Sequence, residues 1–184
     1  MDYHLSMRTV KCIGDSITEG WGLPDPSSQS FPGLLGYENF GSAGAAVQDF
    51  LPEAYVNTLA YQISKGKVTD DTILFLGTND APCLTDAFKE DYEKLVRTYR
   101  PATGRLFLVL PPRTRDTPTN RRLEKINDII SSIALSEHLP VIDLYTPSRD
   151  SWLFHDGIHP GEYGQRQIAA IVQDALNEAD VKEV

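Results

Sequence analysis

Short apolar runs alternate with amphipathic segments along most of the chain. Five of these runs have the length of strands: residues 9–13, 38–40, 71–77, 105–112 and 140–145. The stronger runs are apolar at consecutive positions rather than at every second one, which is typical of strands covered on both faces. We therefore predict five parallel strands in the middle of the fold.

Between the strand candidates, apolar residues recur at helical spacing. Residues 88–99 carry an apolar face opposite a charged one, and residues 123–133 repeat this pattern behind Pro118, which favours a helix start. A last helix is predicted around residues 168–176, and another from about 47 to 64, where a proline blurs the start. This alternation predicts an α/β fold whose crossover helices cover a parallel sheet on both sides.

Residues with chemical potential follow several of the predicted strands. Ser16 comes after the first strand, and Gly44 lies in the glycine-rich stretch after the second. Asn79 follows the third strand, and Asp156 and His159 lie in a long loop after the fifth. Because ligands in such sheets bind outside the carboxyl ends of the strands, we expect these residues to meet at one edge.

The set contains the parts that acyl transfer requires. A serine hydroxyl needs a base, and an imidazole needs a carboxylate that fixes its tautomer. Asp156 and His159 are three residues apart with a glycine between, so a single turn can bring the carboxylate to the ring. The oxyanion needs preorganised donors, which the N–H groups of Ser16 and Gly44 and the amide of Asn79 can supply.

Four short motifs in this order resemble the blocks of the GDSL, or SGNH, hydrolase family. The first is "GDSITEG", with Ser16 as nucleophile, and "NFGSAG" and "GTND" place Gly44 and Asn79 at the oxyanion positions. The last is "DGIHP", with Asp156 and His159 completing the triad. Each motif is weak alone, and the four together are specific. The resemblance implies a flavodoxin-like three-layer α/β/α sandwich with a five-stranded parallel sheet, and no cofactor.

The chain departs from the family pattern at two positions. Ile17 stands where the family name has leucine, a conservative change at a packing position. Ala45 follows Gly44 where many members carry aspartate, which affects loop geometry or substrate contacts rather than the triad.

Other polar residues near the motifs have structural alternatives. We expect Asp15 and Asp80 to bind backbone groups and hold their turns rather than carry protons. His155 competes with His159 for the role of the base, and the family resemblance favours His159. We expect no metal, because a site built from these histidines and Asp156 would leave the serine and the asparagine without a purpose.

Aromatic and basic residues near the motifs leave two alternatives open. Trp21, Trp152 and Phe154 could stack on a sugar ring or cover the edge of the core. Arg113 and Arg115, after the fourth strand, could hold an anionic or polyhydroxylated substrate, although a solvated loop is the simpler expectation.

Composition limits the remaining choices. The chain has 184 residues, 41% of them hydrophobic, which predicts a single domain over residues 1–184. The net charge of −9 without a basic run argues against nucleic acid and anionic membranes as partners. The first eleven residues lack the features of a secretory signal, and Cys12 and Cys83 fit buried thiols in a reducing compartment, so we expect a cytoplasmic protein.

These observations predict a serine ester hydrolase that acts through an acyl-enzyme intermediate on a small-molecule substrate. The connections after Gly44 and Asn79 are short, which favours small acyl groups such as acetyl esters of carbohydrates. The alternatives are an acyl hydrolase of the lysophospholipase or thioesterase type, and a non-catalytic carbohydrate-binding module on the same fold. The oligomeric state is not predicted.

Overall fold

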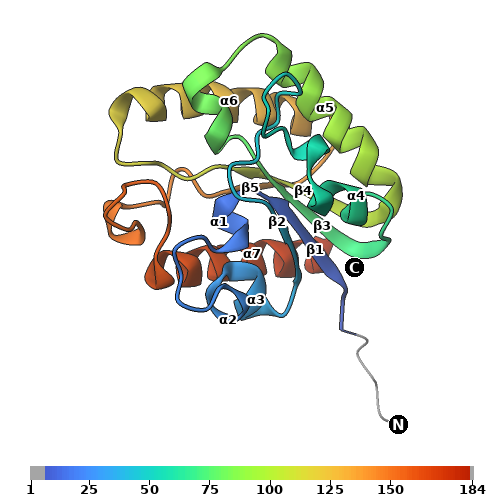
Figure 1. The fold of residues 1–184 in the computed structure, drawn as a ribbon. Coiled ribbons are helices and arrows are strands. Elements are labelled where there is room, and N and C mark those ends of the chain that lie inside the picture. Colours follow the sequence, from blue (N-terminus) through green and yellow to red (C-terminus); the bar gives the residue numbers. More distant parts are fainter. Residues whose placement is uncertain (1–6, 183–184) are drawn as a thin grey trace.

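The computed structural model describes residues 7–182 and contains a five-stranded parallel sheet between two layers of helices (Figure 1). The strands are β1 (Val10–Gly14), β2 (Glu38–Gly41), β3 (Thr69–Phe75), β4 (Thr103–Leu110) and β5 (Val141–Asp143). Their order is β2-β1-β3-β4-β5, and all neighbouring pairs are parallel. This order is that of the flavodoxin-like sheet, so the predicted fold class is confirmed.

Helices of several lengths cover the two faces of the sheet. The long ones are α5 (Ala87–Tyr99), α6 (Thr117–Glu137) and α7 (Glu162–Lys182). The short ones are α1 (Ser16–Glu19), α2 (Pro26–Gln29), α3 (Phe31–Leu35) and α4 (Leu59–Ser64). Short 3₁₀ helices are η1 (Tyr55–Asn57), η2 (Thr78–Cys83), η3 (Arg100–Ala102) and η4 (Asp150–Trp152).

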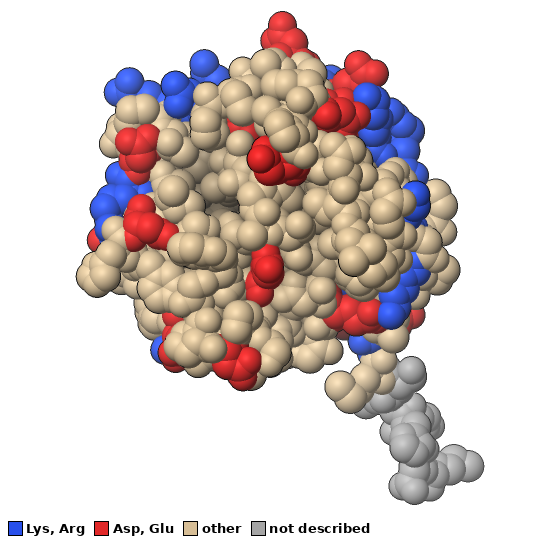
Figure 2. Space-filling model, in the orientation of Figure 1, with Lys and Arg blue, Asp and Glu red and all other residues tan. Residues whose placement is uncertain are grey.

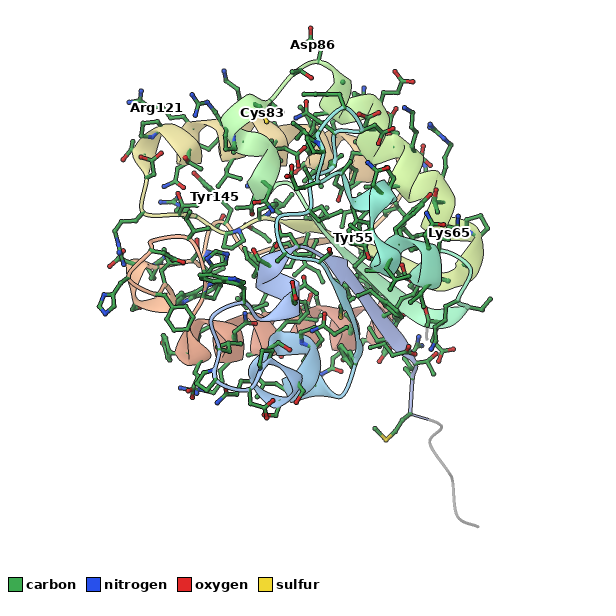
Figure 3. All side chains as sticks on the ribbon, in the orientation of Figure 1. Tyr55, Lys65, Cys83, Asp86, Arg121 and Tyr145 are labelled. Carbon is green, nitrogen blue, oxygen red and sulfur yellow. The ribbon has the colours of Figure 1, made fainter. Side chains whose placement is uncertain are left out.

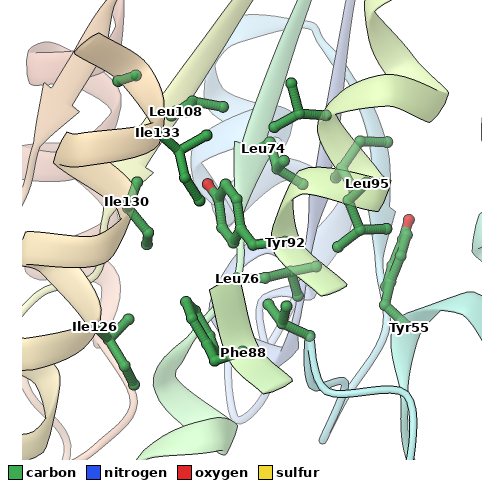
Figure 4. Packing of buried hydrophobic residues seen from close by; sticks show 14 of the residues in the cluster. Tyr55, Leu74, Leu76, Phe88, Tyr92, Leu95, Leu108, Ile126, Ile130 and Ile133 are labelled. Carbon is green, nitrogen blue, oxygen red and sulfur yellow. The ribbon is translucent and has the colours of Figure 1, made fainter. Parts of the chain in front are cut away.

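The sheet is buried on both faces, which explains the continuous apolar runs. Leu74 belongs to a cluster with residues of α5 and α6, such as Tyr92 and Ile130 (Figure 4). Its neighbour Ile73 belongs to a second cluster on the other face, with residues of α7 such as Ile168. Because successive side chains of a strand point to opposite faces, both had to be apolar.

The start of α6 follows from its capping residue. The carboxylate of Asp116 accepts a hydrogen bond from the N–H of Thr119 at 2.8 Å, and the helix begins at Thr117. A side chain that satisfies a free N–H in the first turn stabilises a helix end by about 1 kcal/mol. The predicted start at Pro118 was therefore correct to one residue.

The helix expected over residues 47–64 is wrong for the first half of its length. Only α4 and the single turn η1 are helical in this region. The N–H groups of Val47 and Gln48 donate instead to the carboxylate of Asp80 at 2.9 Å each, and the N–H of Asp49 donates to Asp91 at 2.9 Å. Because these N–H groups already have carboxylate partners and Pro52 has none to donate, the segment is a loop.

The expectation that both cysteines are buried is confirmed for one of them. Cys12 is buried as expected, whereas Cys83 (labelled in Figure 3) is only half-buried.

Within residues 7–182, no helix has both the length and the apolar character that crossing a bilayer would need. Residues 1–6 of the stretch inspected for a secretory signal lie outside the described residues.

Candidate active site

Ser16 lies at a sharp turn between β1 and α1. Asp15 precedes it as the N-cap of α1, and the Asp15 carboxylate accepts a hydrogen bond from the N–H of Ile17 at 2.8 Å. Ile17 is buried in the hydrophobic cluster that also contains Ile73 and Ile168, so it anchors the short helix α1. The turn leaves Ser16 7% exposed at the carboxyl edge of the sheet.

The structure brings Ser16, His159 and Asp156 together. Oγ of Ser16 lies 2.9 Å from Nε2 of His159, across 143 positions of sequence. Nδ1 of the same ring lies 2.6 Å from Oδ2 of Asp156. A carboxylate on Nδ1 holds the proton there, which leaves Nε2 free to accept the serine proton.

Asp156 is oriented by its own turn. Its Oδ1 accepts hydrogen bonds from the N–H groups of Ile158 at 2.9 Å and His159 at 3.0 Å. Partial burial raises the pKa of Asp156, but the Ile158 N–H and the contacts with His159 outweigh it, so the pKa lies below its usual range. The carboxylate therefore remains ionised beside the ring.

Contacts with Arg115 hold the loop that carries His159. The N–H of Arg115 donates to the carbonyl of Gly157 at 2.7 Å. Gly157 has φ of +74°, and a Cβ there would lie 2.8 Å from Cβ of Arg115, so this position requires glycine. The Arg115 guanidinium also donates to Asp150 at 2.6 Å and to the carbonyl of His155 at 3.1 Å. Arg115 is exposed, yet it supports this loop, which the sequence did not indicate.

The two candidate histidines lie in different positions, and the role of His159 as the base stays a prediction. His155 is exposed, and its carbonyl is the group that Arg115 binds. His159 is the histidine whose ring lies between Ser16 and Asp156.

The loops after β2 and β3 meet beside the serine. Nδ2 of Asn79 donates one hydrogen bond to the carbonyl of Ala45 at 3.0 Å, which leaves the second amide hydrogen available. Gly44 adopts φ of +77°, a conformation that glycine takes without strain. Among residues 7–182, the N–H groups of Ser16 and Gly44 donate to no protein acceptor. The oxyanion role of Ser16, Gly44 and Asn79 stays a prediction.

Asp15 and Asp80 bind backbone groups, as expected. Burial raises the pKa of Asp80 to about 6, although the N–H groups of Val47 and Gln48 lower it. Burial raises the pKa of Asp15 to about 7; the Ile17 N–H lowers it and the charge of Asp80 adds to the increase. Both carboxyls are buried, and they shape the loops around the serine.

The aromatic residues near the motifs have different environments. The ring of Trp21 packs on the ring of His159, with centroids 4.4 Å apart and an interplanar angle of 37°, and Trp21 is 52% exposed. Trp152 is buried with the second hydrophobic cluster, so its ring packs against the core and is not open to a substrate. Phe154 is half-buried, and its ring lies so close to Gly22 that a Cβ added there would be 3.2 Å from it. The position of Trp21 near Ser16 in the sequence predicted that it lies close to the site, but not that its ring packs on His159.

No metal centre is built from the described residues: within 7–182, no three or more His, Cys, Asp or Glu side chains converge to hold an ion.

Comparisons with known proteins place this geometry in a family context. A family model described as GDSL-like lipase/acylhydrolase matches residues 12–167. An acetylxylan esterase of Xylanibacter ruminicola is 26% identical over 91% of this chain, and the chain spans only 42% of that relative.

Solved structures share the fold. The acetylxylan esterase Axe2 of Geobacillus stearothermophilus superposes with a TM-score of 0.70 at 18% identity, over 92% of this chain and 94% of that one. A lipolytic protein of the G-D-S-L family from Veillonella parvula gives a TM-score of 0.71 at 21% identity, over 90% and 96% of the two chains.

Proposed function

The chain belongs to the GDSL-like lipase/acylhydrolase family, and we propose that Ser16, His159 and Asp156 are the catalytic triad of a carboxylic ester hydrolase. The observation that carries this proposal is the continuous pair of contacts from Ser16 Oγ to His159 Nε2 and from His159 Nδ1 to Asp156. These distances are within the range in which a base takes the proton of a serine nucleophile.

In the first half of the reaction, Ser16 Oγ attacks the ester carbonyl while its proton moves to Nε2 of His159. The negative charge on the former carbonyl oxygen is stabilised by the N–H groups of Ser16 and Gly44 and by the free amide hydrogen of Asn79. Collapse of this intermediate breaks the ester bond, and Nε2–H gives its proton to the leaving alcohol. The acyl group remains on Ser16.

In the second half, water replaces the alcohol. His159 takes a proton from the water, which attacks the acyl-enzyme, and the proton then returns to Ser16 Oγ as the acid leaves. The Asp156 carboxylate stabilises the imidazolium that forms in both halves.

The substrate class is an acetyl ester on a carbohydrate. This assignment is supported by the similarity to an acetylxylan esterase across most of this chain. An exposed indole beside the base, that of Trp21, could stack on a sugar ring of the leaving alcohol.

The test compares acyl groups under one assay. Purified protein is given aryl acetate, butyrate and octanoate, and then acetylated xylooligosaccharides with acetate release as the readout. We expect the highest kcat/KM with acetyl esters, and Ser16→Ala should lower the rate by more than about 10⁵-fold. A preference for octanoate would indicate a lysophospholipase-type enzyme instead, and binding of the oligosaccharide without acetate release would indicate a carbohydrate-binding module.

A further inference from the structure

A polar pocket lies between the loops that follow β4 and β5. Its volume is about 570 Å3, large enough for a monosaccharide unit, and three arginines line it: Arg113, Arg115 and Arg149. Asp150 is the acidic residue of the lining, so positive charge exceeds negative charge by two. This local excess contrasts with the net charge of −9 of the whole chain.

Arg113 is held in place with its donors uncommitted. Its N–H donates to Oγ of Ser148 at 3.0 Å, and Ser148 Oγ in turn donates to the carbonyl of Tyr145 at 2.8 Å. The guanidinium carbon lies 4.7 Å from the centroid of the Tyr145 ring. The Tyr145 hydroxyl donates to Glu124 at 2.9 Å, which fixes the ring. The Arg113 guanidinium is therefore oriented by stacking, and no described carboxylate forms an ion pair with it.

The other two arginines are already bonded to the protein. Arg149 donates through one nitrogen to the carbonyls of Thr146, Pro147 and Ser148 at 2.9–3.0 Å, so its charge is fixed at the rim. Arg115 is neutralised by Asp150 at 2.6 Å. Arg113 thus supplies the free donors, and Arg149 adds to the positive potential.

The pocket adjoins the loop that carries Asp156 and His159. Arg115, in its wall, donates to the carbonyls of Phe154 and His155, and its N–H donates to Gly157. Figure 2 shows that the Lys and Arg side chains visible on this face lie mainly toward its margins. A group bound in the pocket would lie at the same edge of the sheet as Ser16.

We propose that this pocket binds a carboxylate on the alcohol part of the ester, so that the enzyme favours acetylated saccharides that carry an acidic sugar. The proposal rests on the ester hydrolase function given above. A guanidinium presents two parallel N–H donors that match the two oxygens of a carboxylate, and the bond is strengthened by charge. A sugar phosphate shares this chemistry, and the substrates below distinguish the two.

The experiment measures selectivity as a ratio. The kcat/KM for acetate release is compared between an acetylated xylooligosaccharide with a glucuronic acid branch and the same compound with that carboxylate reduced to an alcohol. A third compound, an acetylated sugar phosphate, tests the other anion. We expect a ratio of acidic to neutral of roughly ten at low salt, falling as ionic strength rises, because the pocket is open to solvent.

Substitutions test whether the pocket causes the preference for the acidic over the neutral compound. Arg113→Gln should bring it close to one, and Arg113→Lys should keep part of it, because lysine retains the charge but not the paired donors. Arg121→Gln is the matched control, since Arg121 is an exposed arginine of α6 outside the pocket lining (Figure 3), and it should keep the wild-type ratio. Equal rates on the two matched compounds, or the same ratio in Arg113→Gln and Arg121→Gln, would overturn the proposal.

A binding measurement separates this proposal from the ester hydrolase function. Ser16→Ala protein is titrated calorimetrically with the glucuronic acid compound and with its reduced form. Tighter binding of the acidic form that is lost with Arg113→Gln supports the pocket even if no acetate is released. Equal binding of the two forms refutes it even if the enzyme hydrolyses both. Preference for the phosphate over the carboxylate contradicts the assigned anion.

Discussion

Asp15 offers a quantitative test of how the turn beside the nucleophile is built. The side chain is fully buried; one oxygen accepts the N–H of Ile17, and the other has no hydrogen-bond partner within the described chain. Asp15→Asn keeps the size of the side chain and the capping oxygen but removes the ionisable group. Asparagine and aspartate are equally good helix caps, so the turn should persist.

The magnitude follows from the pKa of Asp15, which burial raises from 3.8 to about 7. Between these values the folded protein holds a proton that the unfolded chain has released, so the free energy of unfolding falls as pH rises through this window. The full difference is about 4 kcal/mol, at 1.36 kcal/mol for each pKa unit. Between about pH 5 and pH 8.5, roughly 3 kcal/mol of it should be seen.

The assay is urea unfolding of wild type and Asp15→Asn at a series of pH values. We expect the free energy of unfolding of the variant, minus that of the wild type, to increase by about 3 kcal/mol from about pH 5 to pH 8.5. The unpartnered amide hydrogens of the asparagine add an offset that does not depend on pH, so the slope carries the result.

Asp25→Asn is the control without a pH slope. Asp25 is exposed, and the hydroxyls of Ser27 and Ser28 lower its pKa, so it is ionised in both the folded and the unfolded state throughout this pH range. The difference for Asp25→Asn should therefore stay flat from about pH 5 to pH 8.5. A flat or declining difference for Asp15→Asn would refute the conclusion that this carboxyl is forced into a costly buried position.

Substitutions at three residues test the active site by steady-state kinetics on aryl acetate. Asn79→Ala removes one oxyanion donor, and kcat should fall by about 10²–10³ with little change in KM. Asp156→Ala leaves the imidazole without its partner, and kcat should fall by about 10³–10⁴, less than for Ser16→Ala. Trp21→Ala removes the ring that packs on His159, and we expect a lower kcat that Trp21→Phe largely restores; a change confined to KM would show that Trp21 binds substrate only.

The strands, and the convergence of Ser16, His159 and Asp156, could be predicted from local patterns in the sequence. Consecutive apolar residues such as Ile73 and Leu74 require burial on both sides, and the order of strand and helix then limits the topology. The parallel sheet places the ends of its strands at one edge, so Ser16 and Asn79 could be expected there together. The three residues from Asp156 to His159 could be read from spacing alone.

What the sequence missed depends on partners far along the chain. Residues 47–58 have helical spacing, but Asp80 and Asp91 bind the N–H groups that a helix would use. Arg115 lies in a polar loop, and only the fold shows that it holds the carbonyls around Asp156.

Lys11 is a similar case inside the sheet. It is the second residue of β1 and is fully buried, and its ammonium donates to the carbonyls of Ser64 and Lys67. Burial lowers the pKa of Lys11, so these carbonyls are needed to compensate for its lost hydration. Nothing in the spacing of the residues along β1 specifies those acceptors.

Covalent labelling is the most direct test of the triad. Native protein is treated with a fluorophosphonate, which reacts preferentially with an activated serine, and the intact mass and the modified peptide are measured. We expect one adduct, on Ser16, formed at a rate that His159→Ala reduces by several orders of magnitude and that Ser16→Ala abolishes. An adduct on another residue, or equal labelling of wild type and His159→Ala, would contradict the assignment of Ser16 as a nucleophile activated by His159.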